Sequence, residues 1–374
     1  MTTLPRRAGR WHHGPIAAIL LALVLSPSMA GPARAQAACP AATQAGSPID
    51  TWLRAPAGHP LVGTIVRGTE PLTSAAEVCS PSPLAQLHLA LTALLSDGGM
   101  LLLGEVHDNG AQHALRGHLL GAIAADLARR GRPAPGLVFE HIRTDQIAAI
   151  TPSQAPAPTS ARERAIDLIT RLEWDKSGWP AADLFLPIFE AAMAHALPIL
   201  PGHPPRAEVR DVARRGLQAL PADTVTRLGL DVPLPGQLAS ALLDELEASH
   251  CGLMPRSAFA SMAMAQHYRD AHLAANLAAA ASRYGAAILF AGNGHVRSDR
   301  GVPWHLARMA SELKVARKTL AIAFLEVEDG TVDPVAYVPR DPAGTPAADY
   351  VVLTPRTERP DPCDAMRAQF KKKP

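Results

Sequence analysis

The sequence predicts an α/β protein in which a mainly parallel sheet is flanked by helices, with a smaller helical subdomain inserted. Short, continuously apolar runs alternate with segments of helical periodicity, which is the pattern of strands buried on both faces. Between residues 205 and 262, helical periodicity continues without an apolar strand. Of the 374 residues, 48% are hydrophobic and 19% are charged, which excludes a disordered chain and a polytopic membrane protein.

The first 35 residues are predicted to be a secretory signal peptide. Arginines precede an uncharged apolar run at residues 16–25, and the small-residue motif Ala33-Arg34-Ala35 follows it. This order is typical of a cleavable signal, and the apolar run is too short to span a bilayer. We therefore expect an exported protein, either periplasmic or lipid-anchored at the cell envelope.

Cys39, near the start of the mature chain, is expected either to carry a lipid or to form a disulfide. Cys39 follows a small residue, Ala38, as in lipoprotein signals, but Gln36 stands where such signals usually carry a bulky aliphatic residue. The alternative to lipidation is cleavage after residue 35 and disulfide formation, for which four cysteines allow three pairings. The four are Cys39, Cys79, Cys251 and Cys363.

The elements follow one another in a simple order. Residues 36–83 are expected to form an irregular N-terminal segment with a hairpin near residues 61–67, and residues 355–374 to form a flexible tail. The α/β domain is expected between them, over residues 84–340. Its expected strands are 100–103, 136–139, 198–200, 286–290 and 319–327, with a shorter one at 335–338; one more short strand is expected beyond it, at 350–353.

Histidines and carboxylates directly follow four of these strands. In open α/β sheets, ligands bind beyond the carboxyl ends of the strands, so we expect these side chains to line a common cleft. They are Glu105, His107 and Asp108, then Glu140 and His141, then His203, and finally Asn293, His295 and Arg297. Each has a structural alternative: a carboxylate there also stabilises a helix N-terminus or pairs with an arginine, and the glycines around Asn293 also suit a tight turn.

A second polar group interrupts an alanine-rich helix. Gln266, Arg269 and Asp270 share one face by their spacing, while His267 and Tyr268 lie between them. Such residues would be costly if buried without partners, so this helix either faces solvent or lines the cleft.

Two chemistries suit a cleft of this kind. Imidazoles and carboxylates bind a divalent metal such as zinc or manganese, here through Glu105, His107 and His295, and such a metal activates water for hydrolysis. Alternatively, a histidine or tyrosine ligates haem iron. The HExxH, CxxCH and GxSxG motifs are absent, as are glycine-rich phosphate loops, and the net charge of +2 gives no reason to expect nucleic-acid binding.

Several motifs together resemble the ChaN-like family of haem-binding, iron-regulated lipoproteins. Residues 104–109 are similar to its GE-x-HDN motif, 174–180 to WD-x-x-x-WP, 250–252 to HCG, and 265–270 to AQ-x-x-RD. Residues 292–303 are similar to GNGHVR-x-D-x-GVP, so the motifs cover about 100–310 in order. More distantly, the chain resembles the TIKI/TraB and erythromycin esterase superfamily.

This resemblance implies a Rossmann-like core and a role in haem or iron acquisition at the envelope, with a homodimer and an outer-membrane haem receptor system as implied partners. The residues expected to bind haem are His107, His295, Arg297, Tyr268, His267 and Asn293. Glu105 and Glu140 are the candidate catalytic groups if the protein is instead a metal-dependent hydrolase.

Overall fold

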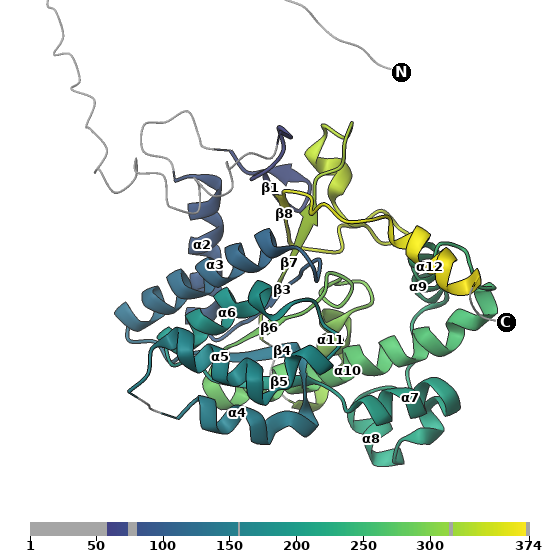
Figure 1. Ribbon diagram of the computed structural model, residues 1–374, viewed down its shortest axis with the longest axis horizontal. Helices are drawn as coiled ribbons and strands as arrows, with labels where there is room; N and C mark the ends of the chain where they lie inside the picture. Colours follow the sequence, from purple (N-terminus) through teal and green to yellow (C-terminus); the bar gives the residue numbers. More distant parts are fainter. Residues whose placement is uncertain (1–57, 74–80, 156–157, 314–316, 372–374) are drawn as a thin grey trace, which may run out of the picture. The chain divides into compact units, whose positions relative to one another are not determined.

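The chain folds around an eight-stranded sheet with the order β2-β1-β8-β7-β3-β6-β4-β5 (Figure 1). The computed structural model describes residues 58–73, 81–155, 158–313 and 317–371. The expected signal peptide, Cys39 and Cys79 lie outside these residues. Within them, no helix is long and apolar enough to cross a membrane.

Six neighbouring strands run parallel, which confirms the predicted α/β class. They are β3 (Met100–Leu103), β4 (Gly136–Arg143), β5 (Ile199–His203), β6 (Ala287–Phe290), β7 (Thr319–Glu326) and β8 (Tyr350–Thr354). Two short antiparallel strands, β1 (Ile65–Arg67) and β2 (Glu70–Pro71), extend the edge beyond β8.

Helices cover the sheet on both faces because the central strands are apolar on both sides. In β3, Leu101 and Leu103 pack on one face, and Met100 and Leu102 on the other. The first face is covered by α2 (Pro83–Ser96), α3 (Gly110–Arg129), α5 (Ala161–Arg171) and α6 (Ala182–Ala194). The second is covered by α7 (Arg206–Arg215), α10 (Phe259–Tyr284) and α11 (Val302–Leu313).

Four further helices and several 3₁₀ turns lie in the described chain. Two of them, α8 (Ala222–Arg227) and α9 (Gly236–Ser249), follow α7 without an intervening strand. Helix α4 (Ile147–Ser153) follows β4, and α12 (Pro362–Lys371) ends the described chain. Single 3₁₀ turns lie at Thr144–Gln146, Trp174–Lys176, Gly216–Ala219, Arg256–Ala258 and Pro334–Tyr337.

The register of the central strands brings their carboxyl ends level. Leu103 of β3 lies opposite Phe290 of β6 and Ile322 of β7, and Phe139 of β4 also lies opposite Phe290. The residues that follow Leu103, Phe139 and Phe290 therefore emerge at one edge of the sheet. This alignment positions the candidate site.

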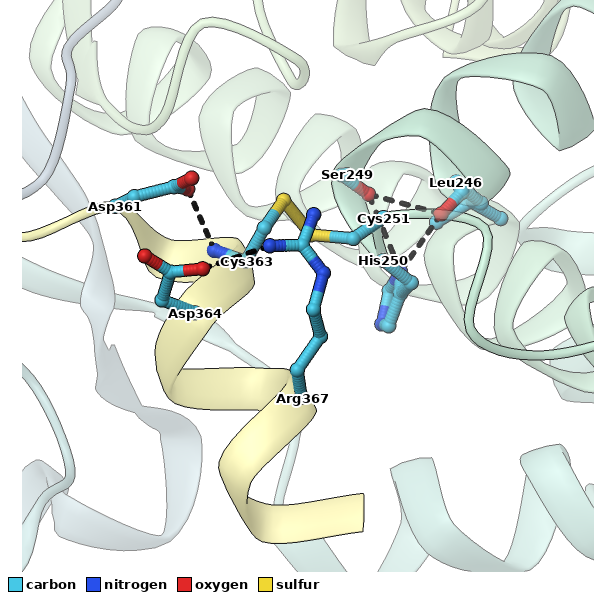
Figure 2. The surroundings of a disulfide bond; sticks show 8 residues. All are labelled: Leu246, Ser249, His250, Cys251, Asp361, Cys363, Asp364 and Arg367. Atoms are coloured by element: carbon cyan, nitrogen blue, oxygen red, sulfur yellow. Dashed lines mark hydrogen bonds and ion pairs between the residues drawn. A yellow bond between two sulfur atoms is a disulfide. The ribbon is translucent and has the colours of Figure 1, made fainter. Parts of the chain in front are cut away.

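Two expectations differ from the structure. Residues 335–338 are not a strand: Pro334–Tyr337 forms a 3₁₀ turn, because the Asp333 side chain accepts the Val335 N–H and caps it. Nor is the described part of the C-terminal segment a free tail. Arg359 pairs with Asp108 and Glu326, and α12 is bonded to the rest of the chain through a disulfide between Cys251 and Cys363 (Figure 2).

Candidate functional site

A buried carboxylate, Glu105, organises the first half of the site. It stands two residues beyond β3, and its Oε1 accepts hydrogen bonds from His107 Nδ1 at 2.7 Å and from His141 Nε2 at 2.8 Å. Its Oε2 pairs with Arg116, which projects from α3 and is fully buried. Burial alone would raise the pKa of Glu105, but Arg116 and the two histidines hold it well below its usual range. Glu105 is therefore ionised.

His113, also on α3, fixes the backbone around this carboxylate. Its Nε2 donates to the His107 carbonyl at 2.8 Å, and its Nδ1 accepts from Arg116 at 2.6 Å. Burial and the neighbouring guanidinium lower the pKa of His113 to about 3, so its ring is neutral. The loop that carries His107 is thus held on both sides.

His107 is the side chain of this group that opens into a cleft. Its Nδ1 is occupied by Glu105, whereas Nε2 has no hydrogen-bond partner among the described residues. A Cβ placed on Gly292 would lie 3.0 Å from Nε2, so only glycine leaves room there. The side chain is 38% exposed. Burial lowers the pKa of His107, but the hydrogen bond to Glu105 and the charge of Glu140 outweigh it and raise the pKa.

The second half of the site is a row of three charged groups. Glu140 Oε2 accepts the Gly292 N–H at 2.7 Å, and its Oε1 lies 3.1 Å from His295 Nε2. His295 Nδ1 lies 2.5 Å from Asp270 Oδ1 on α10. Although burial lowers the pKa of His295, Glu140 and Asp270 raise it to about 10. His295 is therefore an imidazolium between two carboxylates.

This ion cluster makes stability depend on pH. The pKa of His295 is about 10 in the folded state and about 6.5 when unfolded, so its stabilisation is complete below pH 6.5 and is lost as the pH rises through 10. We expect the free energy of unfolding of the wild type to fall over this window by at most about 1.4 kcal/mol per pH unit. Urea unfolding at several pH values measures it, and a His295→Gln variant should lack the decline. An equal decline in both proteins would contradict this assignment.

A cleft of about 630 Å³ joins the two halves. It is bounded by the loop after β3, the loop after β6, and helices α9 and α10. Its lining includes Glu105, His107, Gln266, Asp270, Gly292 and His295, with Leu242 and Leu246 of α9 as its apolar wall. Glu140 lines an adjoining cavity and reaches the cleft through its contact with His295.

Three ligand atoms in the cleft region could hold a divalent metal, but they are not the three expected from the sequence. The atoms belong to Glu105, His107 and His141 and lie within 4.8 Å of one another. His295 is not in this group, because both of its ring nitrogens face carboxylates.

Other predicted ligands are directed elsewhere. The Asn293 side chain borders the cleft, but its amide bonds the Phe324 backbone in both directions, at 2.7 and 3.1 Å. Arg297 forms a bidentate salt bridge with Asp299, from Nε to Oδ1 at 2.9 Å and from Nη2 to Oδ2 at 2.8 Å, and it does not line the cleft. Both residues therefore stabilise the loop after β6.

The face of helix α10 that lines the cleft does not include His267 or Tyr268. Gln266 and Asp270, one turn apart, reach the cleft, whereas His267 and Tyr268 lie on other sides of the helix and are buried. Tyr268 is 1% exposed and donates to Glu208 at 2.6 Å, and His267 packs against His305. The expectation that Tyr268 and His267 reach the ligand is thus not met by their positions.

Arg116 is a site residue that the sequence does not identify, and His141 is one for which the sequence predicts no partner. His141 follows Glu140 in the same strand, and alternation suggests that one of the two points away. In fact both reach the site from different sides of β4: His141 packs against Phe185 of α6 and bonds Glu105, whereas Glu140 contacts His295. Arg116 shares the spacing of Gln112 and Leu119 on the buried face of α3, which is the signal that could have revealed it.

Comparisons with known proteins agree with this fold. The structure matches that of ChaN of Campylobacter jejuni, described as binding haem cofacially, with a TM-score of 0.51 and 16% identity over 77% of this chain and 95% of that one. The type III effector HopBA1 has a TM-score of 0.36 at 14% identity, over 71% of this chain and 92% of its own. A mutant of the erythromycin esterase EreC has a TM-score of 0.30 at 14% identity, over 76% and 83%.

The match to ChaN supports the fold, whereas the similarities to HopBA1 and to the EreC mutant are too weak to support a conclusion. No curated protein matches the sequence. A family model described as haem-binding uptake, Tiki superfamily, ChaN, does match residues 91–306. Because that span is more than half of the chain, the protein belongs to the ChaN family of haem-binding uptake proteins.

Proposed function

We propose that this protein binds haem in the cleft at the carboxyl ends of β3 and β6, with His107 Nε2 as an axial ligand of the iron. The proposal rests on the surroundings of the two nitrogens of the His107 ring. Its Nδ1 is held by an ionised carboxylate, and its Nε2 faces the cleft without a partner. Histidines that ligate metals typically have their second nitrogen fixed in this way, which orients the ring and makes it more basic.

The cleft also has the size and composition of a cofactor site. Its 630 Å³ falls within the range of small-molecule pockets, which are usually apolar with a few directed polar groups. Leu242 and Leu246 offer the apolar surface and His107 the ligand. The family to which the chain belongs is a haem-binding one, which supports haem over other apolar cofactors.

We further propose that the protein acts in haem or iron acquisition at the cell envelope, together with an outer-membrane haem receptor system. The predicted signal peptide supports export, and the disulfide between Cys251 and Cys363 is typical of an oxidising compartment. Whether the mature protein is periplasmic or lipid-anchored at Cys39 is decided by mass spectrometry of its N-terminal peptide.

Titration with haemin tests the binding proposal. We expect a Soret shift that saturates, and in His107→Ala a loss of affinity of about tenfold or more because the iron ligand is gone. His118→Ala is the matched control, since His118 is an exposed histidine on α3, and it should titrate like the wild type. An unchanged Soret band and affinity in His107→Ala would refute His107 as the ligand.

The metal-dependent hydrolase remains a second candidate, because Glu105, His107 and His141 offer an O/N/N donor set that suits zinc or manganese. Arg116 opposes it, since its guanidinium already neutralises Glu105. Elemental analysis of the purified protein and of His141→Ala separates the two functions. Under the haem proposal, the wild type contains no stoichiometric zinc or manganese, and His141→Ala retains haemin binding.

A further inference from the structure

A second cavity, of about 280 Å³, adjoins the cleft and is rich in arginine. Four guanidinium groups line it, from Arg143, Arg206, Arg210 and Arg269, together with a single carboxylate, Glu140. Trp179 and Val209 supply an apolar wall. Although Arg206 and Arg210 are exposed to water, four guanidinium groups around one hollow create a positive potential that attracts anions.

The guanidinium groups are largely without partners in the protein. Arg206 and Arg210, one turn apart on α7, form no ion pair with any described residue. Arg269 donates to Gln266 at 3.3 Å, but its Nε is buried and has no hydrogen-bond partner in the described part of the chain. Arg143 alone has a counter-charge, Asp145, at 2.9 Å. A buried donor left unpaired in the protein is a feature that a ligand oxygen would satisfy.

The remaining titratable groups of the cavity do not cancel this charge. Glu140 is already bonded to the His295 imidazolium and to the Gly292 N–H. The His203 Nδ1–H donates to the Pro204 carbonyl at 2.6 Å, and burial lowers the pKa of His203 to about 4, so its ring is neutral. The cavity therefore offers planar guanidinium groups, above all those of Arg206 and Arg210, that have no ion-pair partner among the described residues. Such groups can form bidentate hydrogen bonds with carboxylates.

The cavity lies next to the proposed iron ligand. The Trp179 ring, which forms part of its wall, is 5.0 Å from the His107 ring. Glu140 in the cavity touches His295 in the cleft. We propose that the arginine-lined cavity binds carboxylate groups and that, in the haem complex, it takes the propionates. This assignment rests on the proposed haem-binding function and specifies how the ligand is oriented.

Haemin and its dimethyl ester, in which both carboxylates are blocked, test the assignment. We expect the wild type to bind the ester about tenfold or more weakly than haemin, since charge-assisted bonds are lost. The variant Arg206→Gln/Arg210→Gln should bind haemin with the reduced affinity of the ester and should bind the ester as the wild type does. Arg214→Gln/Arg215→Gln is the control: these arginines lie on the same helix, pair with Asp211 and do not line the cavity.

Failure of the carboxylate site and failure of haem binding give different results in these titrations. If the wild type and the Arg206→Gln/Arg210→Gln variant bind haemin and its ester equally well, haem binding stands and the carboxylate site is refuted. If the wild type does not bind haemin, the proposed function fails. The site is then judged by succinate: a rise in Tm in the wild type but not in the variant supports a carboxylate site, and no rise refutes it.

Discussion

Replacing Arg116 with leucine should lower the free energy of unfolding by about 3–5 kcal/mol. Both Arg116 and its partner Glu105 are buried, and the guanidinium is the main counter-charge of that carboxylate. His113 would also lose the donor to its Nδ1. The substitution thus leaves an uncompensated buried charge, which costs far more than the net contribution of the pair itself. Urea unfolding at pH 7, followed by circular dichroism, measures the loss.

A surface arginine on the same helix is the matched control. Arg129 is 70% exposed and pairs with Asp126, so Arg129→Leu should change stability by less than about 1 kcal/mol. The double variant Arg116→Leu/Glu105→Gln should lose less than the single variant, because both charges are then absent. If Arg116→Leu were as stable as Arg129→Leu, the ion pair would not be the buried centre of the site.

The sequence predicts the sheet well because the relevant signal is local. A run such as Met100–Leu103 is apolar at every position, which is typical of a short strand covered on both faces. Once the parallel order is assumed, the residues after each run must meet at one edge. Glu105, His107 and His295 do line one cleft, and Glu140 reaches it through His295.

The partners of these residues could not be predicted, because they depend on helix orientation. Arg116 is expected to face solvent as arginines usually do, and only the docking of α3 on the sheet buries it beside Glu105. On α10, alanines surround the polar residues on all sides, so the sequence does not indicate which face meets the cleft. Asp270 and Gln266 reach it, whereas Tyr268 turns to Glu208.

The C-terminal segment also differs from the prediction, because distant contacts fix the position of its described residues. Its composition is polar and rich in proline, which favours a flexible tail. The pairing of Cys251 with Cys363 cannot be deduced from four cysteines alone. Arg359, which pairs with Asp108 near His107 and with Glu326 of β7, holds the segment at a second point.

Removal of this disulfide, in Cys251→Ser/Cys363→Ser, should therefore also lower the free energy of unfolding by several kcal/mol. The bond joins residues 112 apart, so in the chain-entropy model its loss costs about 5 kcal/mol. It ties α12 to the residues just beyond α9 (Figure 2), the helix that supplies Leu242 and Leu246 to the cleft. We expect a lower urea midpoint, faster tryptic cleavage in residues 355–371, and faster release of bound haem as the α9 wall loosens.

Arg367→Gln is the matched control on α12. Among the described residues, Arg367 pairs only with the exposed Asp364 of the same helix, so this variant should leave all three measurements within error. Arg359→Gln separates the two anchors. It breaks the pairs with Asp108 and Glu326 while the disulfide remains, so it should expose the segment to trypsin less than the double serine variant does. If the double serine variant unfolded and was cleaved like the wild type, the salt bridges of Arg359 alone would hold the segment, and the disulfide would not stabilise the wall of the cleft.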